Sequence, residues 1–264
     1  MQDVETGAGG PRRAMMRAQE GMVERQVWRW WSPVVGREMG VARFGWWGKP
    51  VVWFPTGGGD FLDGERFHIV RALEPLIEAG RIKVYLVDST CRQSWTNPDV
   101  PPREKSRMQV RYDQWLMDEL VPLIRSDCGG SDQAIAATGA SLGGYHALNV
   151  TCKHPDTFDL MIGMSGTYAL DRRMAGTWDE DWYYNDPLQF VPNLGPGAQL
   201  DHLRRARFVF GLGQDYENPT YTWRAANALG AAGIWNHVEV WGQGSGHDWP
   251  TWRTMLPMFL DRLV

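Results

Sequence analysis

The sequence contains little cysteine, no long apolar run and no excess of charge of one sign. Its 264 residues include three cysteines, an odd number without metal-ligand spacing, so we expect reduced thiols in the cytoplasm rather than disulfides. Charged residues, glycine or proline interrupt every apolar stretch, so no membrane-spanning helix is expected. The net charge of −4 gives no electrostatic basis for binding nucleic acid or an anionic membrane.

The N-terminal segment differs from the rest of the chain. Residues 1–22 lack the apolar core of a signal peptide, and we expect a flexible leader before a domain that spans residues 23–264. This length suits one large α/β domain, and 43% hydrophobic residues are ordinary for a globular protein. Tryptophan, with 15 residues, is abundant, which suggests that some of these large rings line a pocket.

Strand-like and helix-like segments alternate along the chain. Residues 26–31 and 37–44 predict an antiparallel opening pair, and further apolar strands are predicted at residues 50–54, 81–87, 134–138, 160–164, 207–212 and 236–241. Helical patterns lie between them, so we predict an α/β fold with a mostly parallel, doubly wound sheet, antiparallel first strands and helices on both faces. Residues 168–203 lack periodicity and predict either a cap over the site or a long connection.

The clearest chemical signal is the serine motif after the strand at 134–138. Gly139-Ala140-Ser141-Leu142-Gly143 reads G-x-S-x-G, and a helical pattern follows at once. A serine in this motif between a strand and a helix is typical of the nucleophile elbow of α/β-hydrolases. The turn is so tight that flanking side chains would collide, which glycine avoids. We therefore predict that Ser141 is a nucleophile; the alternative is a glycine-rich turn with an incidental serine.

A second glycine-rich loop, residues 55–60, follows the strand at 50–54. Glycines allow backbone N–H groups to approach a substrate oxygen closely, so the loop predicts part of an oxyanion hole. The expected donors are the backbone N–H of Leu142 and that of Gly58, with Gly57 as the second choice in this loop. The alternative interpretation is an ordinary glycine turn.

A serine hydroxyl needs an imidazole to take its proton. Of the six histidines, His247 alone lies in a glycine-flanked loop after the last predicted strand, where the hydrolase order Ser, acid, His places the base. The acid is expected after the penultimate strand. Asp215 is the first choice because it is closer to the strand end, and Glu217, with a longer side chain, is a competitor. Asp248 fits better as a partner of the following helix N-terminus.

The sequence contains a rival nucleophile and several candidates for the pocket. Ser165, in GMSGTY, is the rival nucleophile, but it lacks the strand-turn-helix pattern and is therefore rejected. Trp95, Tyr145 and Trp249 are predicted to line the substrate pocket, with Trp178 or Trp182 as further candidates. No metal-ligand cluster, phosphate-binding loop or dinucleotide fingerprint occurs in the sequence, so we expect neither a metal nor another cofactor.

Four segments together resemble the putative esterase family of α/β-hydrolases, which includes esterase D-like enzymes and antigen 85-type mycolyltransferases. They are GASLGGYHALN, FPTGGGDF, DSTCRQSW and GHDWPTW, and the likeness, greatest to the small bacterial esterase branch, covers residues 23–264. The resemblance implies an α/β-hydrolase fold, carboxylic ester hydrolysis, Ser141 as nucleophile and His247 as base. Family members use both acid types, so Asp215 and Glu217 both remain open.

We therefore predict a serine carboxylesterase that hydrolyses short to medium acyl or aryl esters through an acyl-enzyme intermediate. The expected partner is a small-molecule ester, and the oligomeric state is not indicated by the sequence. Two alternatives stand beside this prediction: acyl transfer to an alcohol or sugar, and a non-catalytic binding protein with a hydrolase fold.

Overall fold

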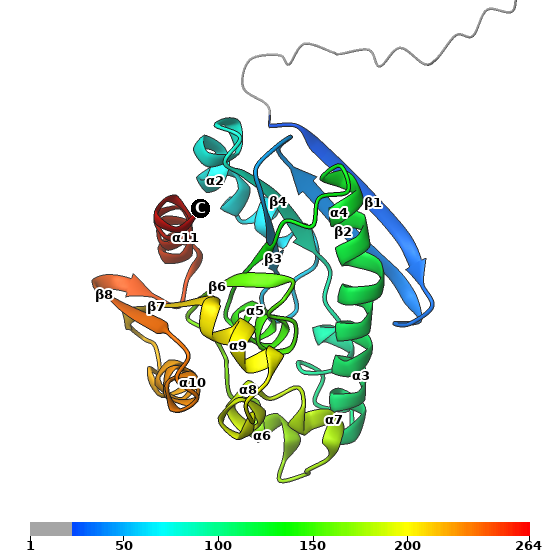
Figure 1. Cartoon of the computed structure of the whole chain (residues 1–264), viewed down its shortest axis with the longest axis vertical. Coiled ribbons are helices and arrows are strands. Elements are labelled where there is room, and N and C mark those ends of the chain that lie inside the picture. The colour runs from blue at the N-terminus through cyan, green and yellow to red at the C-terminus, as the bar shows by residue number, and fades with distance from the viewer. Residues whose placement is uncertain (1–22) are drawn as a thin grey trace, which may run out of the picture.

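A computed structural model describes residues 23–264, and the predicted leader, residues 1–22, lies outside the described residues. At the centre is an eight-stranded sheet with the order β1-β2-β4-β3-β5-β6-β7-β8 (Figure 1). The strands are β1 (Arg25–Ser32), β2 (Arg37–Phe44), β3 (Lys49–Phe54), β4 (Ile82–Val87), β5 (Ile135–Ala140), β6 (Phe158–Met164), β7 (Arg207–Asp215) and β8 (Asn236–Gly246). The pairs β1–β2 and β2–β4 are antiparallel and the others parallel, as predicted.

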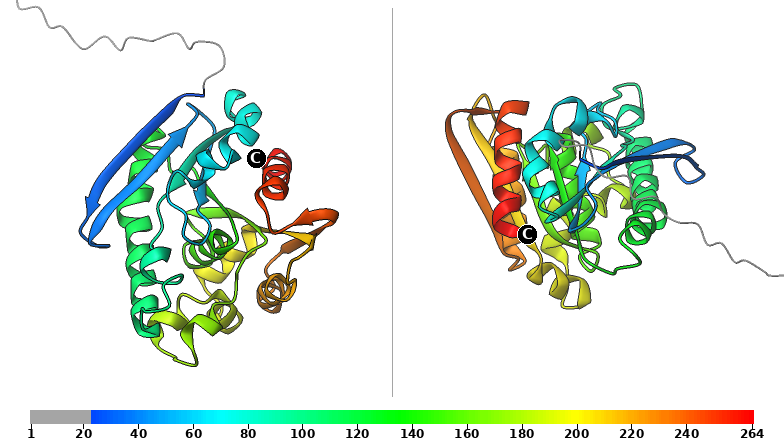
Figure 2. Two further views of the ribbon diagram at one scale, coloured as in Figure 1. Left: turned by 180° about the vertical axis from the view of Figure 1, so that it is seen from behind. Right: turned by 90° about the horizontal axis from the view of Figure 1, so that it is seen from above.

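Helices cover both faces of this sheet (Figures 1 and 2). They are α1 (Asp63–Arg66), α2 (Ile69–Glu78), α3 (Pro102–Trp115), α4 (Val121–Asp127), α5 (Leu142–Lys153), α10 (Thr220–Ala231) and α11 (Trp249–Leu263), and a π turn (Leu116–Leu120) joins α3 to α4. Side chains of α2 and α11 share one apolar core with one face of the sheet. Side chains of α3, α4, α5 and α10 share a second core with the other face. Among residues 23–264, no helix is long and apolar enough to cross a membrane.

The central strands explain where a ligand can bind. Every residue of β4 and β5 is buried, as expected for apolar parallel strands covered on both faces. The chain runs from β3 to β4 on one side of β3, and then crosses back to place β5 on its other side. In open α/β sheets ligands bind at such a switch point, outside the carboxyl ends of the strands. The glycine loop after β3 and Ser141 after β5 both lie at this position.

The irregular segment 168–203 forms a series of short helices. These are α6 (Asp171–Met174), α7 (Glu180–Tyr183), α8 (Pro187–Phe190), a 3-10 turn (Val191–Asn193) and α9 (Ala198–Arg205). Asp179 caps α7 by accepting the backbone N–H of Trp182 at 2.7 Å, and the Trp182 side chain is 3% exposed. The segment packs on α3, α5 and α10, so it is anchored to the body of the domain.

Two strands extend beyond their predicted ends. β7 continues to Asp215 and β8 to Gly246, whereas the sequence predicted ends at residues 212 and 241. Asp215 pairs with Gly246 after a register shift, and its Oδ2 accepts the backbone N–H of Gly244 at 2.7 Å. The prediction of loops at these positions was therefore wrong. The glycine-rich sequence has low strand propensity, and pairing between the two strands overrides it.

Candidate active site

Ser141 lies in a strained turn between β5 and α5. Its φ of 55° and ψ of −121° are unusual for a residue with a side chain, and such strain is typical of functional positions. Its backbone N–H donates to the carbonyl oxygen of Met164 at 3.0 Å, and its own carbonyl accepts the N–H of Thr167 at 2.9 Å. These bonds attach the turn to the end of β6 and hold the serine above the carboxyl end of the sheet.

The glycines of the motif have identifiable packing reasons. A Cβ added at Gly139 would lie 2.5 Å from the backbone of Gly143, and one added at Gly143 would lie 2.3 Å from the carbonyl oxygen of Phe54. Neither position has room for a side chain without moving the backbone of a neighbouring element. The motif therefore brings α5 close to the end of β3, where the glycine loop begins.

The glycine loop forms a tight turn over residues 56–59. The N–H of Gly59 donates to the carbonyl of Thr56 at 2.9 Å, and Gly58 has a φ of 80°, which favours glycine. A Cβ added at Gly57 would lie 3.8 Å from the Leu142 side chain, so the turn faces the elbow. Leu142 is the first residue of α5, where a backbone N–H has no acceptor within the helix. The glycine turn and the first residue of α5, which carry the predicted oxyanion donors, are thus in contact at Gly57 and Leu142.

Two side chains hold this turn in place. Asp63 Oδ2 accepts both the backbone N–H of Thr56, at 3.1 Å, and its hydroxyl, at 2.9 Å. Asp63 is 2% exposed, and burial raises the pKa of its carboxyl while the bonds from Thr56 oppose the rise. On the other side, Arg92 Nε donates to the carbonyl of Gly58 at 2.6 Å. Neither residue was predicted, because the role of each depends on a tertiary contact.

We expect substitution of Asp63 to impair catalysis through the position of the turn. Asp63→Leu removes both bonds to Thr56 and should lower kcat for p-nitrophenyl acetate by about 10- to 100-fold, since misplaced oxyanion donors lose transition-state stabilisation. Asp63→Asn keeps an oxygen that can accept the same two bonds, so it should retain most of the activity. Steady-state kinetics and melting temperatures of both variants test this. Equal losses in the two variants at unchanged stability would contradict it.

His247 lies between the end of β8 and the start of α11. The residue is exposed overall, but its ring packs edge-on against Trp252, with centroids 5.1 Å apart. Partial burial lowers the pKa of His247, and the negative charge of Asp248 opposes this shift. Asp248 also caps α11 by accepting the N–H of Thr251 at 2.9 Å, as its sequence position suggested. In the described part of the chain, the imidazole makes no hydrogen bond to Ser141 or to a carboxylate of residues 215 and 217.

The two candidate acids have different surroundings. Asp215 is the last residue of β7, and its carboxylate is bound to the N–H of Gly244 in β8. Glu217 accepts the hydroxyl of Ser165, and burial raises the pKa of its carboxyl, while the bond from Ser165 opposes the rise. Asp215 thus joins two strands, whereas Glu217 turns inward beside the end of β6.

Ser165 connects the parts of the site. Its hydroxyl donates to Glu217 and accepts the indole N–H of Trp252 at 2.9 Å, and its φ of 49° marks another strained backbone position. Met164, its neighbour, binds the backbone N–H of Ser141, and Trp252 packs against His247. The sequence indicates Ser165 only as a rejected rival nucleophile. The second tryptophan of GHDWPTW was the available signal for this network, but it did not indicate a partner.

The predicted pocket aromatics are more deeply placed than expected. Trp95 and Tyr145 are 1% and 0% exposed and form an apolar cluster with Leu142 and Trp182. The indole of Trp95 donates to Gln109, and the Tyr145 hydroxyl donates to the carbonyl of Asn185. Their rings therefore lie beneath the surface of the site, not on it, because both polar groups are satisfied within the core. Trp178, by contrast, is 60% exposed.

Trp249 differs from the other two, because it is only partly buried. Its ring stacks on Phe67 with centroids 4.4 Å apart and an interplanar angle of 11°. Trp249 follows His247 by two residues in the sequence, so this aromatic stack remains a candidate surface for substrate. Within residues 23–264, no group of three or more His, Cys, Asp or Glu side chains is arranged to hold a metal ion.

Comparisons with known proteins agree with the fold. Among solved structures, an S-formylglutathione hydrolase from Agrobacterium tumefaciens is similar, with a TM-score of 0.70, 16% identity, and coverage of 94% of this chain and 97% of that one. A ferulic acid esterase matches with a TM-score of 0.68, 17% identity, and coverage of 92% and 100%. MPT51 of Mycobacterium tuberculosis matches with a TM-score of 0.63, 19% identity, and coverage of 88% and 94%.

The likeness to these structures shows the α/β-hydrolase fold. A search of the curated proteins finds no match. The family model described as Putative esterase matches residues 50–263, which include the glycine loop, the elbow and His247. The chain therefore belongs to the putative esterase family and is a hydrolase of carboxylic esters with the α/β-hydrolase fold.

Proposed function

We propose that the chain is a serine carboxylesterase that works through an acyl-enzyme, with Ser141 as nucleophile and His247 as general base. The observation that carries this proposal is the strained backbone of Ser141, which holds its hydroxyl at the start of α5 opposite the glycine turn. A rigid elbow that faces free backbone donors is the arrangement that acyl transfer requires.

For the acid we propose Glu217, and no longer the first choice from the sequence, Asp215. Glu217 is partly buried and is linked through Ser165 and Trp252 to the surroundings of His247. The Asp215 carboxylate is engaged by the N–H of Gly244, where it serves the pairing of β7 with β8. Hydrogen bonds within a catalytic triad are often long without substrate and tighten in the complex.

The reaction proceeds in two halves. His247 takes the proton of the Ser141 hydroxyl as Oγ bonds to the ester carbonyl carbon, and the carbonyl oxygen becomes an oxyanion held by the N–H groups of Leu142 and of Gly58 or Gly57. Collapse of this intermediate breaks the bond to the alcohol oxygen, which receives the proton from His247. Water then attacks the acyl-enzyme by the same route, releases the acid and restores Ser141.

The substrates we propose are short to medium acyl or aryl esters, because Trp249 and Phe67 offer an aromatic surface beside the base. Turnover of p-nitrophenyl esters from acetate to laurate tests this, and a burst of p-nitrophenolate equal to the enzyme concentration is expected from an acyl-enzyme. Inactivity on the whole series would contradict the proposal. We retain a cytoplasmic location as part of it, supported by the free state of the three cysteines.

The acidic limb of the pH profile gives a further test. Only the neutral imidazole can take a proton, and partial burial lowers the pKa of His247. We therefore expect kcat/KM to rise with pH, with a midpoint below the ordinary value of 6.5. Asp248→Asn keeps the cap on α11 but removes the charge that opposes the shift, so its midpoint should move to lower pH. A move to higher pH would contradict this assignment.

A further inference from the structure

The strand β8 is an unprotected edge of the sheet. It is 11 residues long and pairs only with β7 among the described strands (Figure 1). A long edge strand can pair with another chain, and proteins usually guard such edges with proline, lysine or short length. β8 contains neither proline nor lysine, and Val240 on it and Trp235 beside it are 53% and 52% exposed. This edge is therefore available for pairing.

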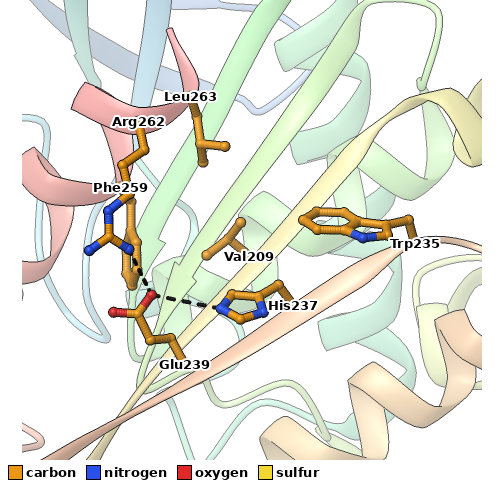
Figure 3. A pocket seen from close by; sticks show the side chains of 7 residues that line it. All are labelled: Val209, Trp235, His237, Glu239, Phe259, Arg262 and Leu263. Atoms are coloured by element: carbon orange, nitrogen blue, oxygen red, sulfur yellow. Dashed lines mark hydrogen bonds and ion pairs between the residues drawn. The ribbon is translucent and has the colours of Figure 1, made fainter.

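Side chains along the edge alternate between its two faces. Trp235, His237 and Glu239 point to the same side and line a hollow of about 260 Å³ next to Arg262 (Figure 3). Glu239 accepts a bond from Arg262 at 3.0 Å, and His237 Nε2 lies 3.7 Å from its carboxylate. The Trp241 indole also donates to Glu239 at 2.9 Å, so it belongs to the same face. Val238 and Val240 lie on the other face.

The order of these residues is self-complementary. Residues 235–241 read W-N-H-V-E-V-W, with a tryptophan at each end and a histidine and a glutamate on either side of Val238. In an antiparallel pair centred on Val238, His237 lies opposite the partner's Glu239, and Trp235 lies opposite the partner's Trp241. A histidine opposite a glutamate can form a hydrogen bond to the carboxylate, and aromatic pairs are favourable across neighbouring strands. We propose that two copies of this chain associate by antiparallel pairing of their β8 strands, centred on Val238.

Other registers are less favourable. Centring on Glu239 would place two like carboxylates directly opposite each other, and centring on Val240 would place His237 opposite the partner's Gln243. The register on Val238 places both the His–Glu pairs and the Trp–Trp pairs on one face, and Arg262 of each copy offsets the charge of the Glu239 carboxylate that it binds. A two-fold axis through Val238 gives an isologous dimer, which closes and does not propagate.

Sedimentation equilibrium tests the association with two variants at one exposed position. At a concentration of about 100 μM the wild type should have twice the mass of the chain. His237→Glu puts like charges opposite each other and should weaken the dimer at least about tenfold, whereas His237→Lys places a positive charge opposite Glu239 of the partner copy and should preserve the dimer. Melting temperatures confirm folding. A monomeric wild type, or equal dimerisation of both variants, would overturn the proposal.

A disulfide test examines the register directly. Val238→Cys places two thiols across the axis, where facing Cα atoms are about 4.5–5.5 Å apart, within the range of a disulfide. In the same register Val240 lies opposite Asn236 of the other copy, so the two thiols of Val240→Cys are four strand positions apart. This separation of about 13 Å is too large for a disulfide. On oxidation Val238→Cys should form a covalent dimer, while Val240→Cys and the wild type should not. Cross-linking of Val240→Cys alone would overturn the register.

Discussion

Replacement of Ser141 by alanine should lower kcat for ester hydrolysis by about 10⁶-fold. The covalent step is lost with the nucleophile, and only the catalysis from the oxyanion donors and from substrate binding remains. Alanine is smaller than serine, so the variant should fold with an unchanged melting temperature. Turnover of p-nitrophenyl acetate by the wild type and the variant measures the effect.

Ser165 provides the matched comparison for this experiment. It is the other serine in a strained backbone position at the carboxyl end of the sheet, and its hydroxyl serves Glu217 and Trp252. Ser165→Ala removes the hydrogen bond to Glu217, the proposed acid, and should therefore lower activity, but it should retain the burst of p-nitrophenolate. If Ser165→Ala abolishes the burst and Ser141→Ala does not, the nucleophile has been assigned to the wrong serine.

The second large effect is expected at Glu217. Glu217→Gln keeps the size of the side chain but removes the charge that stabilises the imidazolium, and loss of the triad acid costs about 10³- to 10⁴-fold in kcat. Asp215→Asn keeps an oxygen for the N–H of Gly244, so we expect less than about a tenfold change from it. Steady-state kinetics of the two variants decide between the acids. The reverse order of effects would restore Asp215, the first choice from the sequence.

The local geometry of the candidate site could be predicted from the sequence. The tight turn at Ser141 between a strand and a helix requires small residues next to it, and the added-Cβ contacts at Gly139 and Gly143 explain this requirement. The order of strands and helices likewise predicted the parallel sheet. His247 lies directly after the last strand, as predicted, and its role as base stays a proposal.

The remaining features depend on contacts between distant segments. Ser165 and Glu217 are 52 residues apart, and Trp252 and Ser165 are 87 residues apart, so no local pattern marks their hydrogen bonds. The burial of Trp95 and Tyr145 was not predicted for a related reason. The sequence alone does not distinguish an aromatic side chain that lines a pocket from one that packs in the core. The extensions of β7 and β8 arise from pairing that their glycines disfavour.

Glycine has opposite roles in these two places. At the elbow it allows close approach of backbone segments, which the sequence motif reveals. At the ends of β7 and β8 it conceals strand structure, because it lacks the side chains that make a strand pattern visible. The segment that carries His247 was therefore predicted as a loop, although it follows directly from a strand of the sheet.

Labelling with a fluorophosphonate tests the central claim, an activated serine at residue 141, most directly. The reagent bonds to a serine only where the hydroxyl is activated as a nucleophile. Intact mass spectrometry should show one adduct per chain, and peptide mapping should place it on Ser141, with no adduct on Ser141→Ala. No adduct on the folded wild type, or an adduct on another serine, would contradict the account, and absence of labelling would favour a binding protein with a hydrolase fold.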